Sequence, residues 1–265
     1  MPTDRSARAP WRSLAAAGLT VLALAAPRPV AAVAKSVDEL IAEGDQHYAQ
    51  AHLAEARSAY VAALQANPAN YLALCRAARA ESELGELQKG DEQRRTRAAA
   101  VEHARAAVKA VPDSAAGHVW LSVALGRQAL SEGAKAKLAL SREIKSEVDR
   151  ALQLDPGIGR AWHVLAMWNF KLSSLNMFER LGASAMGGVP RGASFENAEK
   201  AFLKAIAIEP GYVNHHLEYG RMLKSQGRAA DARRELEKAV SLPPDSDALD
   251  ARYQAEAKEL LQRLK

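Results

Sequence analysis

The stretch VNHHLEYGRMLKSQGRAADARRELEKAVSLPP, residues 213–244, carries the pattern from which the fold of this chain follows. Pro210 precedes this stretch and Pro244 closes it, 34 residues later. Because proline lacks a backbone N–H and disfavours helical geometry in the residue before it, each proline marks the end of a helix. Three more prolines end similar Ala-rich runs: Pro68, Pro112 and Pro156. This self-similarity predicts an array of helical hairpins, and such arrays bind partners far more often than they catalyse.

The small residues of this stretch match the tetratricopeptide repeat, whose period is about 34 residues. Gly220, Ala232 and Ala239 stand where that repeat needs small side chains, because larger ones would hold two antiparallel helices apart. The same pattern recurs earlier in the chain, at Gly44, Ala56, Tyr60, Ala63 and Pro68, and again at Ala198, Phe202 and Ala205. The sequence therefore predicts an all-α, tetratricopeptide-like solenoid of helical hairpins.

The other intervals between the prolines are longer, at 44, 44 and 54 residues. We attribute the two 44-residue intervals to extended second helices, and the third to an extra element over residues 173–194. A last helix over 246–264 is expected to cap the solenoid. The full set of predicted helices is 36–50, 53–67, 71–86, 92–111, 114–129, 133–154, 158–172, 175–186, 194–209, 212–226, 229–242 and 246–264.

The first 34 residues differ from the rest of the chain. Three arginines precede an uncharged run over residues 13–27, and the triplet Ala-Val-Ala at 32–34 offers a cleavage site before Lys35. This layout is typical of a secretory signal peptide, and the apolar run is short for a membrane span. We expect residues 1–34 to be removed, and residues 35–265 to form a single domain in the periplasm. A retained membrane anchor is the alternative.

Charge and composition exclude several classes of function. The whole chain has a net charge of +5, but residues 1–34 contribute +3, so the mature chain is near +2. A net charge this small does not indicate nucleic-acid binding. Cys75 is the single cysteine, which excludes an internal disulfide and CxxC sites. No HExxH motif, nucleophile elbow or Gly-rich phosphate loop is present. We therefore expect no enzyme, no cofactor and no metal site. His118, His163 and His216 stand at nearly equivalent places, which packing explains.

Three longer strings resemble a known family. They are AAGHVWLSVALG at 115–126, KAKLALSREIKSEVDRALQLDPG at 135–157, and the run from AWHVLAMW to AFLKAIAIEP at 161–210. Their order and the stretched repeats are similar to the regulator of microtubule dynamics family of tetratricopeptide-like proteins. The resemblance covers the chain from Ser36 onward. It implies a helical-hairpin fold and kinship with eukaryotic members associated with microtubules and with exported bacterial members. An exported protein would not meet cytoplasmic tubulin, so the microtubule role is not carried over.

A basic surface is the first candidate binding site. In tetratricopeptide geometry the first helix of each hairpin lines the concave face, and basic residues are frequent at those positions. The predicted groove residues are Arg79, Arg127, Arg160, His163, Phe170, Lys171, Arg221 and Lys224. Such a face could hold an acidic peptide, a C-terminal carboxylate or an anionic headgroup through charge-assisted bonds. The alternative is a solvated face whose cations pair with neighbouring Glu and Asp side chains.

An aromatic group is the second candidate. It consists of Trp120, Trp162, Trp168, Phe170 and Phe178. These side chains could form an apolar groove for a lipid, although aromatic residues at helical spacing more often form the core. Trp168 is the hardest of them to assign to the core by register. We therefore predict an interaction scaffold that binds a protein or peptide, with a lipid or small hydrophobic ligand carrier as the alternative. The oligomeric state is left open.

Overall fold

The computed structural model describes residues 35–244 and 247–264. The predicted signal peptide falls on residues 1–34, which lie outside the described residues. Residues 35–265 form one compact unit.

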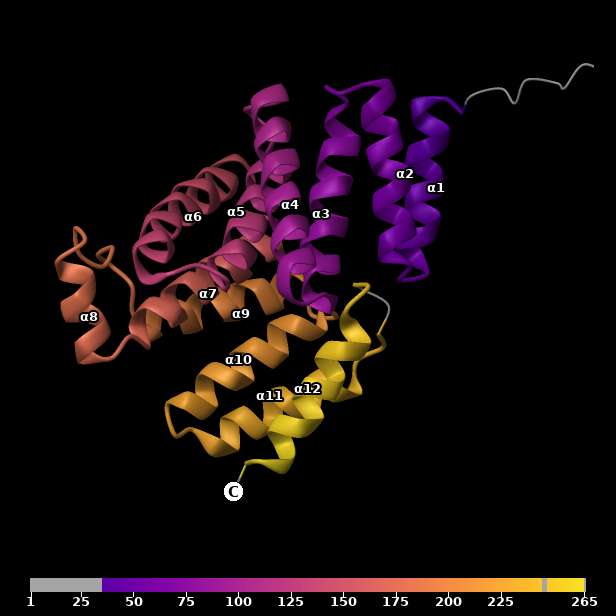
Figure 1. Ribbon diagram of the computed structural model, residues 1–265. Helices are drawn as coiled ribbons and strands as arrows, with labels where there is room; N and C mark the ends of the chain where they lie inside the picture. Colours follow the sequence, from indigo (N-terminus) through magenta and orange to yellow (C-terminus); the bar gives the residue numbers. More distant parts are fainter. Residues whose placement is uncertain (1–34, 245–246, 265) are drawn as a thin grey trace, which may run out of the picture. The chain divides into compact units, whose positions relative to one another are not determined.

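Within the described ranges the chain forms twelve α-helices and no strand (Figure 1). These are α1 Val37–Ala49, α2 Leu53–Ala66, α3 Tyr71–Leu87, α4 Gly90–Ala110, α5 Ala115–Ala129, α6 Ala134–Leu154, α7 Gly159–Ser173, α8 Met177–Ser184, α9 Phe195–Ile208, α10 Val213–Ser225, α11 Ala229–Ser241 and α12 Asp250–Gln262. No helix of the described part is long and apolar enough to cross a membrane.

The helices pack as successive hairpins. α1 packs against α2, α3 against α4, α5 against α6, α7 against α9 and α10 against α11. The first helices also contact one another, α3 with α5, α5 with α7, and α7 with α10. This arrangement confirms the predicted all-α helical-hairpin solenoid. α12 packs on α10 and α11 as the expected cap.

The unequal proline intervals have the predicted causes. α4 and α6 each have 21 residues, whereas α2 has 14, so the two 44-residue intervals contain long second helices. In the 54-residue interval, α7 pairs with α9 and the eight-residue α8 is inserted between them in sequence. A capping box starts α8, with the Asn176 side chain accepting from the backbone N–H of Glu179 and the Glu179 carboxylate accepting from that of Asn176.

Small residues sit where paired helices touch. A Cβ on Gly220 of α10 would lie 2.8 Å from Cγ of Leu236 on α11. A Cβ on Gly44 of α1 would lie 2.3 Å from Cε1 of Tyr60 on α2. Both distances are shorter than real Cβ contacts, so only glycine permits these approaches. Ala232 on α11 is fully buried in the same hairpin as Gly220. The repeat register read from the sequence is therefore the one that packs.

A repeated hydrogen bond ties each of three hairpins to the proline before it. The residue six positions after the proline donates a ring N–H to the proline carbonyl. His118 Nε2 lies 2.8 Å from the Pro112 oxygen, Trp162 Nε1 lies 2.8 Å from that of Pro156, and His216 Nε2 lies 3.2 Å from that of Pro210. The equivalent residues are thus His118, Trp162 and His216. His163 lies one position beyond Trp162, which agrees with the expectation that His118, His163 and His216 stand at nearly equivalent places.

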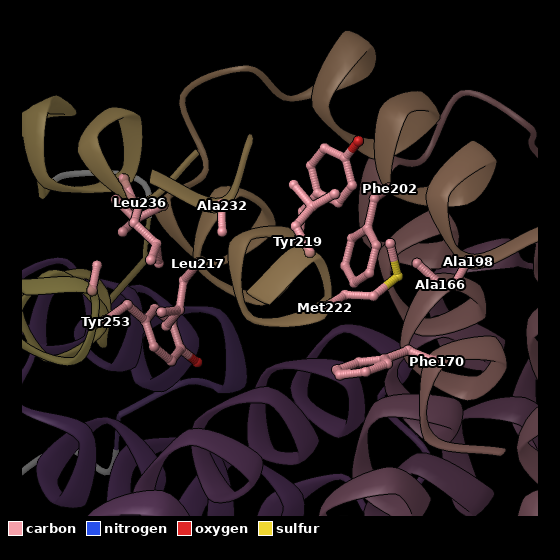
Figure 2. Packing of buried hydrophobic residues seen from close by; sticks show 14 of the residues in the cluster. Ala166, Phe170, Ala198, Phe202, Leu217, Tyr219, Met222, Ala232, Leu236 and Tyr253 are labelled. Carbon is pink, nitrogen blue, oxygen red and sulfur yellow. The ribbon is translucent and has the colours of Figure 1, made fainter. Parts of the chain in front are cut away.

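The largest hydrophobic cluster joins α7, α9, α10, α11 and α12. Figure 2 shows the rings of Phe170 and Phe202 around Met222 within this cluster. The Tyr219 ring stacks on Phe202 with centroids 5.6 Å apart. Trp168 is buried in a neighbouring cluster, where its Nε1 donates to the Ser141 carbonyl at 2.7 Å. Trp168 and Phe170 are therefore core residues.

Candidate functional site

Four predicted groove arginines lie on successive first helices. Arg79 comes from α3, Arg127 from α5, Arg160 from α7 and Arg221 from α10. These helices contact one another in that order, and Arg127, Arg160 and Arg221 all donate to the segment 247–256, so these three side chains share one surface of the solenoid. The Trp120 ring of α5 lies beside two of them, 5.6 Å from Arg79 and 5.5 Å from Arg160. We call these four residues the arginine cluster.

Each member of the cluster faces a carboxylate. Arg160 Nη2 donates to Asp247 Oδ2 at 2.9 Å, and Arg160 Nη1 donates to the Tyr212 hydroxyl at 3.1 Å. Arg79 Nε donates to Glu83 Oε1 at 3.3 Å, one helical turn away. The guanidinium of Arg160 is thus held in position by the residue that precedes α10 and by the segment before α12.

The other two arginines belong to a chain of ion pairs. Arg127 Nη1 lies 2.9 Å from Glu86 Oε2. Arg221 Nη2 lies 3.0 Å from Glu256 Oε2, and the same carboxylate accepts from Arg252. Arg252 also donates to the backbone carbonyl of Glu86. These bonds connect α3, α5, α10 and α12. The alternative that the basic face is paired with neighbouring carboxylates therefore holds for its arginines.

A buried carboxyl group lies beside Arg79. Glu83 is 5% exposed and accepts a hydrogen bond from the Tyr48 hydroxyl at 2.5 Å. Burial raises the pKa of Glu83 to about 7, and the nearby Asp247 carboxylate adds to this rise, while Arg79 and Arg160 oppose it. Burial also raises the pKa of Tyr48. A carboxyl group in contact with the arginine cluster therefore has a pKa close to neutral.

Two histidines stack behind Arg160. His163 of α7 and His215 of α10 have ring centroids 4.9 Å apart, and their Nδ1 atoms are 3.0 Å apart. At that distance one Nδ1 carries a proton and donates a hydrogen bond to the other Nδ1. Burial lowers the pKa of both rings, and for His163 the neighbouring His215, Arg127 and Arg160 lower it further. Glu209, 3.3 Å from His215 Nε2, opposes this lowering for His215, and the stacked pair joins two first helices.

The remaining predicted groove residues do not contact the cluster directly. Phe170 is 5% exposed in the core, with its ring 6.3 Å from that of Phe195, so it offers little surface to a partner. Lys171 is exposed at the end of α7, and Lys224 is half-buried at the end of α10. The structure thus gathers the arginines and His163, and leaves the two lysines at helix ends.

The described residues hold no group of three or more His, Cys, Asp or Glu side chains placed to bind a metal ion. Nor do the buried histidines combine with a nucleophile: His118 and His216 contact Glu147 and Glu235 at 2.6 Å and 2.7 Å. The guanidinium groups of the arginine cluster are suited to hold carboxylates or other anions by charge-assisted hydrogen bonds, as their pairs with Glu83, Glu86, Asp247 and Glu256 illustrate.

Comparison with known proteins identifies the family. The family described as regulator of microtubule dynamics protein 1-3 matches residues 35–265. The chain belongs to this family. It is 31% identical over 189 residues to regulator of microtubule dynamics protein 3 of Rattus norvegicus, a match that spans 71% of this chain and 40% of that protein. It is 26% identical over 191 residues to protein 1 of Mus musculus, spanning 71% of this chain and 62% of that one.

The chain spans about two fifths to three fifths of the length of these two curated relatives. Among solved structures, a thermophilic TPR protein of Thermus thermophilus aligns with a TM-score of 0.61 and 20% identity, covering 83% of this chain and 98% of that one. This likeness concerns the fold alone. It agrees with the tetratricopeptide-like architecture described above.

Sequence reasoning missed the partners of the cluster in this regulator of microtubule dynamics family member. Asp247 and Tyr253 lie 87 and 126 residues from the arginines that they contact. The apolar side of the last helix is visible in the sequence, but it predicts only a cap. The sequence signal that could have indicated a partner of the arginines is the acidic residue Asp247, two positions before the buried Leu249.

A second concave feature includes no member of the arginine cluster in its lining. It is an open pocket of about 730 Å³, lined by α6, α7, α9 and the loop before α9. Trp162, Trp168 and Leu165 line its apolar part. Four cations also line it: Lys145, Arg191, Lys200 and Lys204. Phe178, the last member of the predicted aromatic group, is 80% exposed on α8 and does not line the cavity.

Proposed function

We propose that this protein is a non-enzymatic interaction scaffold, whose arginine cluster binds a protein or peptide partner that carries carboxylates. Catalysis, a cofactor and nucleic acid have no part in this proposal. The observation that carries it is the alignment of Arg79, Arg127, Arg160 and Arg221 along contacting first helices, each already directed at a carboxylate. A surface preorganised in this way binds without first having to order its own side chains.

The partial burial of the arginine cluster favours a role in peptide recognition over that of an ordinary solvated surface. Arg160 is 20% exposed and Arg127 is 25% exposed, so both are partly desolvated and remain reachable. Charge-assisted bonds to partly buried guanidinium groups are stronger and more directional than those at an open surface. Trp120 beside Arg160 is half-buried and adds flat apolar surface for a side chain that follows the carboxylate.

Binding of a labelled acidic helical peptide tests this proposal. Fluorescence anisotropy would compare a Glu-rich helical peptide with the same peptide carrying Gln at every Glu. We expect only the acidic peptide to bind, with an affinity that falls as salt is raised, because screening weakens exposed charge pairs. Equal binding of the neutral peptide would overturn the proposal.

Charge reversal locates the site. Since Arg127 and Arg160 hold internal ion pairs, their reversal would disturb folding as well as binding. Lys171→Glu with Lys224→Glu changes the charge at the ends of two first helices instead. The matched control is Lys109→Glu with Lys238→Glu, two exposed lysines on the second helices α4 and α11. We expect the first pair to weaken binding of the acidic peptide and the control pair to leave it unchanged.

A lipid or small hydrophobic ligand carrier is the second proposal, favoured by the cavity of about 730 Å³ with Trp162 and Trp168 in its lining. Its four cations suit an anionic headgroup. Organic extraction of the purified protein followed by mass spectrometry tests it. A co-purifying lipid that is lost in the variant Trp162→Ala, with the acidic peptide still bound, would favour the carrier.

We also propose that the protein acts in the periplasm after removal of residues 1–34. The arginine-flanked apolar run and the Ala-Val-Ala triplet support this proposal. The family match begins at residue 35, where the mature chain would start. In that compartment the partner is an exported protein or a protein segment that faces the periplasm.

A further inference from the structure

The C-terminal segment, residues 247–264, contacts more of the chain than the cap of a solenoid requires. A cap has only to cover the apolar surface that the last hairpin leaves open. α12 does this against α10 and α11. The same segment also reaches α3, because Arg252 donates to the backbone carbonyl of Glu86 across 166 residues of sequence.

The polar groups of this segment match the arginine cluster. The Asp247 carboxylate accepts from Arg160 of α7 at 2.9 Å, and Asp247 is 7% exposed. The Tyr253 hydroxyl accepts from Arg127 of α5 at 3.1 Å. Asp247 also holds the turn that leads into α12, since its Oδ1 accepts from the backbone N–H of Leu249 at 3.0 Å. One residue therefore both holds the turn before α12 and anchors the segment to the cluster.

The inward side of α12 continues this match. Leu249 is 1% exposed, Tyr253 is 6% exposed, and Glu256 accepts from Arg221 of α10 at 3.0 Å. Positions 249, 253 and 256 follow the spacing of one helix face. This is the geometry in which an amphipathic helix lies in a groove, with anchors at every third or fourth residue.

We propose that residues 247–264 are an intramolecular ligand of the arginine cluster, and that an acidic helical segment of a partner binds by taking their place. This inference rests on the proposed function, which it deepens by naming the form of the partner. The partner segment places a carboxylate on Arg160 at the start of a helix, a leucine two residues later, and an aromatic or acidic side chain toward Arg127.

Exchange is favoured by the kind of contact that holds the segment. The contacts of Arg127, Arg160 and Arg221 with the segment can be reproduced by a partner that supplies the same groups. Without the segment Arg127 would keep Glu86 and Arg221 would keep Glu218, but Arg160, which is only 20% exposed, would lose its carboxylate partner Asp247, and this is costly. Arg160 therefore favours the states in which its guanidinium is paired, either with Asp247 or with a carboxylate of a partner.

An attached ligand acts at a high effective concentration, in the millimolar range for short connections. A partner must compete with it, so the apparent affinity for the partner is reduced by the fraction of molecules in which the cluster is free. Weakening the internal contact should therefore tighten the binding of an external peptide. This expectation separates an internal ligand from a merely structural cap, whose loss would not improve binding.

The test uses the full mature chain and a labelled synthetic peptide of residues 247–264 as the probe. Asp247→Asn in the chain removes the charge that Arg160 binds and keeps an oxygen to accept from Leu249. We expect this variant to bind the probe about tenfold more tightly than the wild-type chain in fluorescence anisotropy. A probe that itself carries Asp247→Asn should lose that gain.

Two further variants keep the result interpretable. Glu259→Gln is the matched control, since Glu259 is an exposed carboxylate on the same helix and pairs only locally with Arg263. It should leave probe binding unchanged. Tyr253→Phe removes only the hydroxyl that Arg127 contacts, and it should give a smaller gain in the same direction. If Asp247→Asn lowers the melting temperature strongly, Tyr253→Phe is the variant that decides the test.

The outcomes distinguish this inference from the proposed function. Equal probe binding by wild type, Asp247→Asn and Tyr253→Phe would overturn the inference. If the Glu-rich peptide binds all three chains equally, the scaffold function stands and the inference falls. If the variants gain affinity for the probe while no chain binds the Glu-rich peptide, the segment is an internal ligand and the acidic-partner function falls.

Discussion

Glu83 shows at the scale of one residue how the fold controls a proton. Its carboxyl group is enclosed by Tyr48 of α1, Arg79 of its own helix, Arg160 of α7 and Asp247. Two cations favour the charged form, but burial and the second carboxylate outweigh them and raise the pKa to about 7. The folded state thus holds the Glu83 proton more tightly than the unfolded chain does.

This difference predicts a pH dependence of stability. A group whose pKa is raised on folding stabilises the fold below its unfolded pKa, and this contribution is lost as the pH rises through the folded value. For Glu83 the window runs from 4.5 to about 7, which corresponds to at most about 3 kcal/mol. Between pH 4.5 and 8 the free energy of unfolding should therefore fall less in Glu83→Gln than in wild type.

Urea titrations at several pH values would measure the free energy of unfolding of wild type and Glu83→Gln. The control is Glu102→Gln, because Glu102 is an exposed carboxylate on α4. Parallel pH profiles for wild type and Glu83→Gln would contradict the assignment of this proton to Glu83.

At the scale of one element, glycine has opposite effects in two helices. Gly44 in α1 faces the Tyr60 ring, and an added Cβ would lie 2.3 Å from it. Gly126 in α5 has no atom within 4 Å of such a Cβ. Gly44→Ala should therefore destabilise the protein by about 1–3 kcal/mol through overpacking. Gly126→Ala should stabilise it by about 0.5–1 kcal/mol, because alanine is the better helix former.

Thermal unfolding followed by circular dichroism distinguishes the two changes by sign. A lower melting temperature for Gly44→Ala together with a higher one for Gly126→Ala is expected. Shifts of the same sign would show that the α1–α2 contact can relax around a methyl group.

The pairing of α10 with α11 gives a further prediction. Ala232 is fully buried, and its carbonyl oxygen lies 3.3 Å from a Cβ built on Gly220. Ala232→Leu should cost about 1–3 kcal/mol, because the close-packed interface has no room for the added carbons. Ala230→Leu, on the exposed side of the same helix, should change the stability by less than about 0.5 kcal/mol. Equal melting temperatures for the two variants would contradict the repeat register.

At the scale of the whole molecule, export determines which partners are available. We predict that the mature protein begins at Lys35 and is released with the periplasmic fraction. The reason is the combination of an arginine-rich start, a short apolar run and a small-residue cleavage site. N-terminal sequencing of protein from fractionated cells measures this directly. Bulk protein that still begins at Met1 or Pro2 would rule out cleavage.

The hairpins could be predicted because their signals are local. Prolines end helices through their own covalent geometry, and small residues at fixed spacing indicate where two adjacent helices meet. The helix order, the long α4 and α6, the inserted α8 and the capping α12 all followed from such signals. The three histidines stand at nearly equivalent places, as expected, and the hydrogen bond to Pro156 comes from Trp162, one position before His163.

Local signals in the sequence were enough to predict the repeat, the family and the set of basic residues on the first helices. What those residues contact depends on how the hairpins pack. Arg160 meets Asp247 and Arg127 meets Tyr253 because five hairpins stack and bring the last helix back to α5 and α7. Trp168 is buried for the same reason, since the carbonyl that it needs belongs to α6. Helical periodicity links residues three or four apart, whereas these contacts join residues 27 to 126 apart, and only packing determines them.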